Sequence, residues 1–463
     1  MKGSSSTKLS IGYFHEDRGD DFDESSNELR MLDDKILMFH NLRNLKSMVI
    51  CGCRNLSYIS FKGFSYLVSL TSLEIRGCEK LLSSNEMPEH AHEDMPTANC
   101  SGFPSLKSLR IVSCGIAGKW LSLMLQHAPC LEKLYLYSGD EENSVSNLSS
   151  TREGTSSGNP NGGLARDGPS HIPLNLFSPL KKITIERCPR LTFDWGKEGV
   201  SGFTSLEKLL ILDRPDLLSS LVHTNGRWLL PASLQKLTIS DYSQEALQPC
   251  FPSDITSLKR LRVYRSPDLQ SLQLHSCTAR EELSIWSCGS LTVTALEGLQ
   301  PLGSHRHLDV SDCIGLPPFS ESLSRLCPRL EMLEMNGPSV LTTSFCKHLT
   351  SLKRLQLYSL EKLTRLTDEQ ERALVLLKSL ERLTFFWCKE LVDLPSRLRN
   401  LSSLKSLEIH FCKEISRLPE AGLPHSLEEL EIRFCSKKLE DECRRLATCE
   451  GKLKVKIDWR RVN

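Results

Sequence analysis

The sequence predicts an α/β solenoid, in which short coils stack along a parallel β-sheet. Three observations predict this fold. A motif of spaced aliphatic residues recurs along the chain, its apolar positions alternate as they do in a strand, and the chain is too long for one ordinary core. It has 463 residues, whereas a single domain holds about 100–200. Aromatic residues make up only 6% of the chain, so the core must be built mainly from aliphatic side chains.

The recurring motif is L-x-x-L-x-[LIV]-x-x-C-x-x-L. One clear copy consists of Leu404, Leu407, Ile409, Cys412 and Ile415. Its second apolar residue recurs at fifteen positions, mostly 22 to 28 residues apart: 48, 73, 109, 134, 183, 209, 237, 261, 283, 308, 333, 355, 383, 407 and 430. This is the period of leucine-rich repeats. We therefore expect a leucine-rich-repeat solenoid, or horseshoe, with a parallel concave β-sheet and short helical or irregular convex segments.

The motif also predicts which side chains face outward. Side chains two residues apart on a strand point to the same side. The two aliphatic residues of L-x-[LIV] therefore enter the core, where neighbouring coils cover them. The residues next to them face outward on the concave surface, which is where a partner could bind.

A cysteine follows many of these strands by three residues. Nine copies have it: Cys53, Cys78, Cys114, Cys188, Cys288, Cys313, Cys388, Cys412 and Cys435. Leucine-rich repeats carry Asn or Cys in this position, and a small buried thiol with a weak donor can bond the turning backbone. Thiols on adjacent coils would risk disulfides in an oxidising compartment, so the pattern favours the cytoplasm or nucleus.

The repeats are interrupted by segments of different composition. We expect five regions: a flexible N-terminal segment at 1–40, a first block of repeats at 41–137, a loop insertion inside that block at about 82–103, a disordered insertion at 138–179, and a second block of repeats at 180–459. The first segment is acidic and shows no repeat. The insertion at 138–179 is rich in Ser, Gly and Asn and nearly free of apolar residues, which is typical of disorder.

The second block is expected to contain two helices and a terminal strand. Thr367 and Gln370 form the pattern of a capping box, which predicts a helix over 367–377. A helix-like segment at 439–447 and a final strand at 453–459 are expected to form the C-terminal cap.

Two copies carry a basic residue in the first leucine position, Arg280 and His305. A charge in a core position is costly unless it reaches solvent or is paired. We expect both side chains to extend outward and to weaken the stack locally. The alternative is that they mark a bend or a switch point.

The residue that follows each L-x-[LIV] forms a stripe on the expected concave face. In the last eight repeats this stripe reads Tyr264, Trp286, Ser311, Asn336, Tyr358, Phe386, His410 and Arg433. Aromatic residues and Arg are enriched at interface hot spots. The candidate protein-binding residues are Tyr264, Trp286, Tyr358, Phe386, His410 and Arg433. The alternative is that the rings pack on one another along the stack.

Nothing in the sequence predicts catalysis. It contains no phosphate-binding loop, no G-x-S-x-G, no H-E-x-x-H and no set of kinase motifs. We expect no catalytic residue, no cofactor and no metal. The formal net charge of +1 does not favour a nucleic-acid partner. No apolar run approaches the 20 or so residues of a membrane span, and no apolar segment near Met1 resembles a secretory signal.

The carboxyl-terminal repeats resemble those of a known family. Residues 340–360, VLTTSFCKHLTSLKRLQLYSL, and residues 380–435 resemble the repeats of plant nucleotide-binding leucine-rich-repeat (NLR) disease-resistance proteins, in particular the cereal members. The L-P-x-x-[LI] steps at Leu394-Pro395 and Leu418-Pro419 are typical of that group. The resemblance covers about residues 41–459.

The resemblance implies a sensor in plant innate immunity. In that family the repeats recognise a pathogen effector or a guarded host protein and restrain a nucleotide switch. The implied partners are such a protein and an upstream nucleotide-binding domain that is missing from this chain. ATP or ADP binding is not implied, since no residues here match that domain.

Two other binding roles stay open. F-box-type substrate adaptors also use Cys-containing repeats, although residues 1–40 do not show the helical bundle that such an adaptor would carry. The chain could also be a free-standing leucine-rich-repeat interaction protein.

Overall fold

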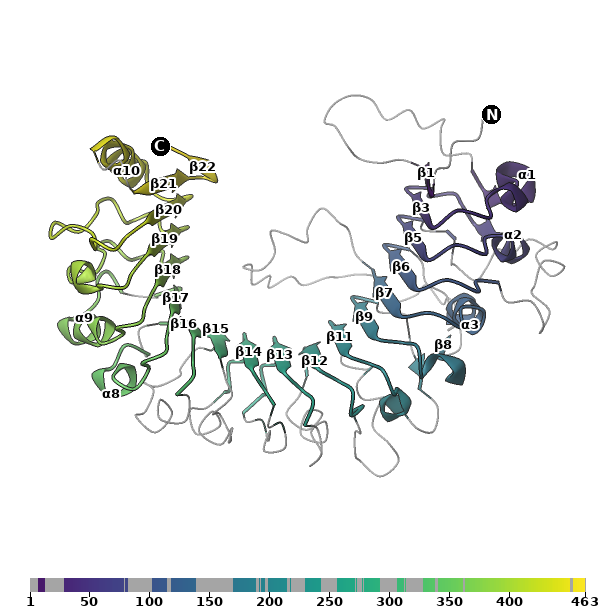
Figure 1. Ribbon diagram of the computed structural model, residues 1–463, viewed down its shortest axis with the longest axis horizontal. Coiled ribbons are helices and arrows are strands. Elements are labelled where there is room, and N and C mark those ends of the chain that lie inside the picture. The colour runs from purple at the N-terminus through teal and green to yellow at the C-terminus, as the bar shows by residue number, and fades with distance from the viewer. Residues whose placement is uncertain are drawn as a thin grey trace, which may run out of the picture. The chain divides into compact units, whose positions relative to one another are not determined.

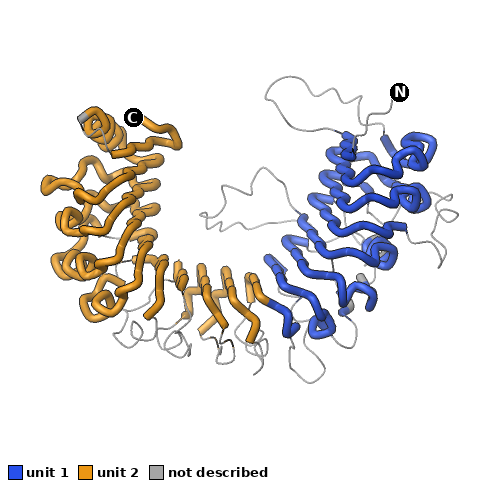
Figure 2. Tube along the Cα trace, in the orientation of Figure 1, with its two compact units in different colours: residues 1–234 blue, residues 235–463 orange. Residues whose placement is uncertain are grey.

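The structure is a computed structural model. It describes residues 7–12, 29–78, 80–81, 102–114, 118–138, 170–188, 191, 193–195, 199–214, 217, 230–242, 256–270, 272, 277, 279–291, 306–311, 313, 328–337, 340–360, 363–449 and 453–462. The chain divides into two compact units, residues 1–234 and 235–463 (Figure 2).

Unit 1 is built on a parallel sheet of short strands (Figure 1). Neighbours in the sheet follow chain order: β1 (Lys8–Gly12), β3 (Ser47–Cys51), β5 (Ser72–Arg76), β6 (Ser108–Val112), β7 (Lys133–Tyr137), β9 (Lys182–Glu186) and β11 (Lys208–Leu212). Two short pairs lie apart from this sheet: β2 (Met31–Leu32) with β4 (Tyr58–Ile59), and β8 (Ser170–His171) with β10 (Phe193–Asp194). The helical segments are α1 (Asp34–Leu37), η2 (Phe39–Asn41), α2 (Phe61–Ser65), α3 (Gly118–Gln126), η5 (Leu174–Leu176) and η6 (Gly199–Gly202).

Unit 2 repeats this plan. Its parallel strands are β12 (Lys236–Ser240), β13 (Arg260–Tyr264), β14 (Glu282–Trp286), β15 (His307–Ser311), β16 (Met332–Asn336), β17 (Arg354–Tyr358), β18 (Arg382–Phe386), β19 (Ser406–His410), β20 (Glu429–Arg433) and β21 (Lys454–Ile457). The short β22 (Arg460–Arg461) pairs antiparallel with β21. The helical segments are α8 (Thr343–Cys346), α9 (Asp368–Val375), η9 (Leu398–Asn400) and α10 (Lys437–Cys449). Within each unit the strands line the inner side of a curve, here called the concave face (Figure 1).

The strands form where the motif predicts them. All fifteen marked positions are the second residue of a strand, and each pairs in register with the same position of its neighbour, as Leu383 does with Leu407. The second and fourth residues point into the coil: Leu407 and Ile409 are both 0% exposed. The predicted fold class, a leucine-rich-repeat solenoid, is confirmed.

A left-handed residue follows most of the strands. It has a positive φ at Ser113, Arg187, Asp213, Asp241, Arg265, Ser287, Ser359, Trp387, Phe411 and Phe434, and Gly takes the place at Gly52, Gly77 and Gly337. This conformation costs a non-glycine residue about 1–2 kcal/mol. Hydrogen bonds between coils hold it in place: the Trp387 N–H donates to the His410 carbonyl over 2.8 Å. The turn sends the chain out of the sheet and into the coil.

The cysteines occupy the position predicted for them. Each bonds the turning backbone in the way expected of Asn or Cys there: the Cys412 Sγ donates to the His410 carbonyl over 3.2 Å and lies 3.7 Å from the Phe385 carbonyl of the preceding coil. Cys388 and Cys114 make the same two contacts in their own coils. Among the residues that the structure describes, no cysteine forms a disulfide.

The N-terminal segment differs from the prediction. Residues 8–12 form β1, in which Leu9 and Ile11 pair with Met48 and Ile50 of β3. Residues 31–41 contain β2, α1 and η2, and the Asp33 carboxylate caps α1. The prediction of a flexible segment over 1–40 is therefore wrong for these residues. Leu9 and Ile11 supply the alternating pair that a strand needs, although the rest of the motif is missing.

The two insertions are described only in part. The predicted loop at 82–103 lies outside the described residues except at its end, where Phe103 is buried. Of the insertion predicted at 138–179, residues 139–169 lie outside the described residues. Its last part contains β8 and η5, and Leu176 there is fully buried. The prediction of disorder is therefore wrong for residues 170–179, which contribute apolar side chains to the next coil.

Arg280 is placed differently from the prediction. Its side chain is 0% exposed, so it does not extend into solvent. Arg280 occupies the first apolar position of the motif, and its counterparts Leu380 and Leu404 are also 0% exposed. Its charge lies close enough to Cys277 to oppose the rise that burial produces in the pKa of that thiol. His305 lies outside the described residues, and the alternative of a bend or switch point stays a prediction.

The carboxyl-terminal elements form as predicted. In α9 the Gln370 N–H donates to the Thr367 hydroxyl, and the Gln370 side chain accepts from the Thr367 N–H, which completes the capping box. Leu374 and Leu377 are buried. Helix α10 and strand β21 lie at the positions predicted for the cap.

Candidate functional site on the concave face of unit 2

The predicted stripe exists as the last residue of each strand. In-register pairing brings its members together in two groups, Tyr264 beside Trp286, and Tyr358, Phe386, His410 and Arg433 in a row. Their ring contacts are consistent with the packing alternative: the Tyr264 and Trp286 centroids are 6.0 Å apart at 72°, and those of Tyr358 and Phe386 are 5.0 Å apart. The rings are nevertheless half-buried, so part of each still faces outward. Protein binding by these residues stays a prediction.

His410 is the most enclosed member of the stripe. It is 7% exposed and lies edge-on to Phe386, with centroids 6.1 Å apart. Burial lowers its pKa, and the nearby Arg433 guanidinium lowers it further. His410 is therefore uncharged at neutral pH and acts mainly as a packing residue beneath its neighbours.

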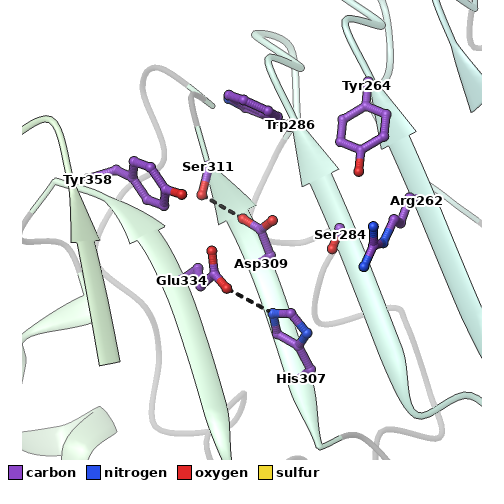
Figure 3. Close-up of a pocket in the computed structure, with 9 residues that line it drawn as sticks. All are labelled: Arg262, Tyr264, Ser284, Trp286, His307, Asp309, Ser311, Glu334 and Tyr358. Atoms are coloured by element: carbon purple, nitrogen blue, oxygen red, sulfur yellow. Dashed lines mark hydrogen bonds and ion pairs between the residues drawn. The ribbon is translucent and has the colours of Figure 1, made fainter. Parts of the chain in front are cut away.

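A shallow hollow of about 200 Å³ lies over β13 to β17 (Figure 3). Its lining consists of Arg262, Tyr264, Ser284, Trp286, His307, Asp309, Ser311, Glu334 and Tyr358. The three aromatic stripe residues that line it, Tyr264, Trp286 and Tyr358, surround it near the ends of their strands. The polar side chains of the lining, which come mostly from the middle of the strands, form its floor. The candidate site is therefore an aromatic rim around a charged floor.

Ion pairs hold the floor in place. The Glu282 side chain is 7% exposed, and its carboxylate forms ion pairs with the guanidinium groups of Arg260 over 3.1 Å and Arg262 over 2.5 Å. The imidazole of His307 lies 3.2 Å from the carboxylate of Glu334 (Figure 3). These contacts fix charged side chains in defined positions, so a partner meets a pre-arranged pattern of charges.

Within the floor, the Asp309 carboxyl has a raised pKa. Burial raises the pKa of its carboxyl to about 6, and the nearby Glu334 carboxylate contributes to the rise. The Ser311 hydroxyl donates to Asp309 over 2.5 Å (Figure 3), which opposes the shift. Burial also raises the pKa of the Tyr358 and Tyr264 phenols, so both stay protonated donors at neutral pH.

This carboxyl predicts a pH-dependent stability. Because its pKa is higher in the folded chain than the ordinary 3.8, the folded state holds the proton more tightly, and stability falls as pH rises from about 4 to about 6. Asp309→Asn removes this loss and keeps an oxygen for the Ser311 hydroxyl. We expect the variant to be more stable than the wild type by about 1–2 kcal/mol at pH 7.5, after allowance for solvent screening, and equal to it at pH 3.5. Urea unfolding of both chains at the two pH values measures this, and an equal difference at both would contradict it.

The floor of the hollow was not predicted from the sequence. Arg262, Ser284, Asp309 and Glu334 are the third residues of successive strands, and each is polar. That row was a usable signal, since third residues face outward as fifth residues do. A second row of aromatic residues, one position beyond the stripe, was not predicted either. The dipeptides Trp387-Cys388, Phe411-Cys412 and Phe434-Cys435 could have indicated it.

The described residues contain neither a metal-binding cluster nor a membrane-spanning helix. Within the ranges given above, no group of three or more His, Cys, Asp and Glu side chains is placed to hold a metal ion. In the same part of the chain, no helix is long and apolar enough to cross a membrane.

Comparisons with known proteins add little to this description. No protein-family profile matches the sequence, and no curated protein matches it. Among the solved structures that the chain resembles is the crystal structure of the Rad7 and Elc1 complex in yeast. That likeness has a TM-score of 0.33 and 15% sequence identity, and it covers 90% of this chain and 83% of that one. The assignment of the fold rests on the coils themselves.

Proposed function

We propose that the chain is a non-catalytic protein-recognition scaffold whose concave face in unit 2 binds a protein partner. The observation that carries this proposal is the hollow over β13 to β17, where Tyr264, Trp286 and Tyr358 surround a floor of fixed charges. Aromatic residues with a polar surround are typical of interface hot spots, because rigid rings bury a large area at low entropic cost.

The dimensions favour a protein over a small molecule. Pockets for small molecules usually hold about 300–1,000 Å³ and enclose most of the ligand. The hollow measures about 200 Å³, and it continues into a sheet of many strands. A partner that covers several coils would use the hollow as one contact among many.

We further propose that this scaffold is the sensor part of a plant NLR receptor, acting in the cytoplasm or nucleus. The support is the resemblance of residues 340–360 and 380–435 to the repeats of that family. On this proposal the partner is a pathogen effector or a guarded host protein, and an upstream nucleotide-binding domain would contact the same chain.

A photo-cross-linking experiment identifies the partner. A benzophenone side chain replaces Tyr264 in the full chain, and a control chain carries it at Arg399, an exposed residue of η9. We expect a protein adduct from position 264 that the control does not give. An effector or its host target among the adducts supports the receptor proposal, whereas a ubiquitin-ligase subunit overturns it in favour of a substrate adaptor.

Trp286 is expected to contribute strongly to the affinity for that partner. Trp286→Ala removes the largest ring on the rim, and we expect at least about tenfold weaker binding. Calorimetric titration of the full chain measures this. Val392→Ala is the matched control, since Val392 is 39% exposed and lies outside the hollow. Thermal unfolding of both variants separates lost binding from lost folding.

A further inference from the structure

A second aromatic surface lies beside the stripe at the carboxyl-terminal end of unit 2. It consists of Trp387, Phe411, Phe434 and Trp459, here called the aromatic row. The first three directly follow β18, β19 and β20, and Trp459 follows β21 by two residues. Successive ring centroids are 6.1, 5.0 and 5.1 Å apart. The row is therefore continuous from one coil to the next.

The row is exposed although it is apolar. Phe411 is 37% exposed, Phe434 is 42% and Trp459 is 63%. Their backbones are left-handed, with φ of 56°, 51° and 66°. That turn directs the side chains away from the coil interior, so the rings cover one another and, at Phe411, the Phe386 ring of the stripe, whose centroid is 5.5 Å away. Exposed apolar surface of this continuity usually marks an interaction site.

The fold itself does not need rings at these positions. The same left-handed turn carries Ser113, Ser287 and Ser359 in other coils, and Gly77 and Gly337 elsewhere. Small residues therefore make the turn equally well. Four aromatic residues in consecutive coils add exposed apolar area without filling the core, which favours a role in binding.

Cations border the row. The Lys389 ammonium lies 5.1 Å from the Trp387 centroid, and the Arg433 guanidinium lies 5.3 Å from that of Trp459. Arg460 and Arg461 are exposed and directly follow Trp459. Glu390 and Glu414 lie one residue farther along the chain than Lys389 and Lys413. Two carboxylates also lie close to the row: Asp458 accepts from the Phe434 N–H over 2.9 Å, and Glu431 pairs with Arg433. The four cations Lys389, Arg433, Arg460 and Arg461 outnumber these two carboxylates beside the rings, which favours an acidic partner.

We propose that the aromatic row binds an amphipathic α-helix of a partner protein, with apolar residues at i, i+3 or i+4, and i+7, flanked by acidic residues. This proposal rests on the proposed function and specifies one kind of partner. Two of the three ring spacings, 5.0 and 5.1 Å, are close to the rise of about 5.4 Å per helical turn, and the third, 6.1 Å between Trp387 and Phe411, is longer. Each turn of such a helix can place one apolar side chain against one ring.

Two other occupants fit the geometry less well. On an extended strand, side chains of one face recur about every 6.6 Å, which is longer than the spacing of the phenyl rings. Single-stranded nucleic acid stacks its bases on open ring faces. The Phe411 and Phe434 rings are stacked on each other at 21°, so their facing surfaces are already covered.

A peptide selection tests this assignment with the full chain. The probe is a displayed library of peptides of about 18 residues, or five helical turns. Half of its members are patterned as amphipathic helices and half as alternating strands, with random flanking charges. We expect enriched sequences to come from the helical half and to carry acidic flanks. The proposal is overturned if the enriched peptides come from the strand half, if they carry basic flanks, or if no peptide is enriched. It is also overturned if a single-stranded oligothymidine binds more tightly than the enriched peptides.

Variants confirm where the selected peptides bind. Phe411→Asn with Phe434→Asn removes two rings and keeps a residue that tolerates a left-handed backbone. We expect at least about tenfold weaker peptide binding by fluorescence anisotropy. The matched control is Leu376→Asn with Val392→Asn, because these side chains are 37% and 39% exposed in the same unit. Equal binding by both double variants would overturn the proposal.

The two proposals fail in different ways. If the aromatic row binds no helix while Trp286→Ala still weakens binding of the cross-linked partner, only the proposal for the aromatic row is wrong. If Trp286→Ala has no effect while the row binds acidic helices, the hollow is not the recognition site.

Discussion

Replacing Phe385 with alanine is expected to lower the free energy of unfolding by about 3–5 kcal/mol. Phe385 is the fourth residue of β18 and is 0% exposed. It pairs in register with Leu357 on one side and Ile409 on the other. Loss of the ring leaves a cavity that two neighbouring coils share, and close-packed interiors relax only partly around such a cavity. Urea unfolding of the full chain gives the change.

Two further measurements make this prediction specific. Phe385→Leu keeps most of the volume, so we expect a clearly smaller loss, below about 1.5 kcal/mol. Each coil of a repeat array contacts only its neighbours. Hydrogen exchange should therefore increase first at β17, β18 and β19, and least in unit 1. A uniform increase throughout the chain would contradict this account.

Replacing Glu371 with alanine is expected to destabilise the chain by about 2–4 kcal/mol. Glu371 lies in α9 and is 7% exposed. Its carboxylate accepts from the Ser396 N–H over 2.9 Å, from the Ser396 hydroxyl over 2.6 Å and from the Arg397 N–H over 3.1 Å. These bonds connect the helix of one coil to the turn that precedes η9 in the next. Alanine leaves three donors without this acceptor.

Two controls separate this connection from general effects on the helix. Glu369→Ala removes an exposed carboxylate from the first turn of the same helix, and we expect a loss below about 1 kcal/mol. Glu371→Gln keeps one oxygen acceptor and should fall between the two. Thermal and urea unfolding of the three variants provide the comparison, and equal losses for Glu369→Ala and Glu371→Ala would show that the contact with Ser396 is unimportant.

The sequence was sufficient to predict the repeat architecture. Spacing alone marked each strand of the concave sheets from residue 48 to residue 430, because two inward aliphatic residues must recur for coils to stack. Strand β1 was missed because Leu9 and Ile11 satisfy only the alternation and not the whole motif. The Arg280 side chain was predicted to extend outward because burying a charge is costly. It is buried nevertheless, as are the leucines at the equivalent position of other copies.

The candidate site was predicted less completely. The stripe followed directly from strand alternation, so Tyr264, Trp286 and Tyr358 were found. The hollow depends on side chains from five strands that meet only when registers are known, and Asp309 alone gives no sign of its raised pKa in the sequence. The aromatic row depends on a left-handed turn at Phe411 and Phe434, which residue types other than Gly and Asn do not indicate.

The most direct test of protein recognition by the concave face is the affinity of the cross-linked partner for the chain carrying Trp286→Ala. We expect binding at least about tenfold weaker than that of the wild type, with Val392→Ala unchanged and both variants folded. If the partner binds the Trp286→Ala chain as tightly as the wild type, the concave hollow of unit 2 is not where this protein recognises its partner.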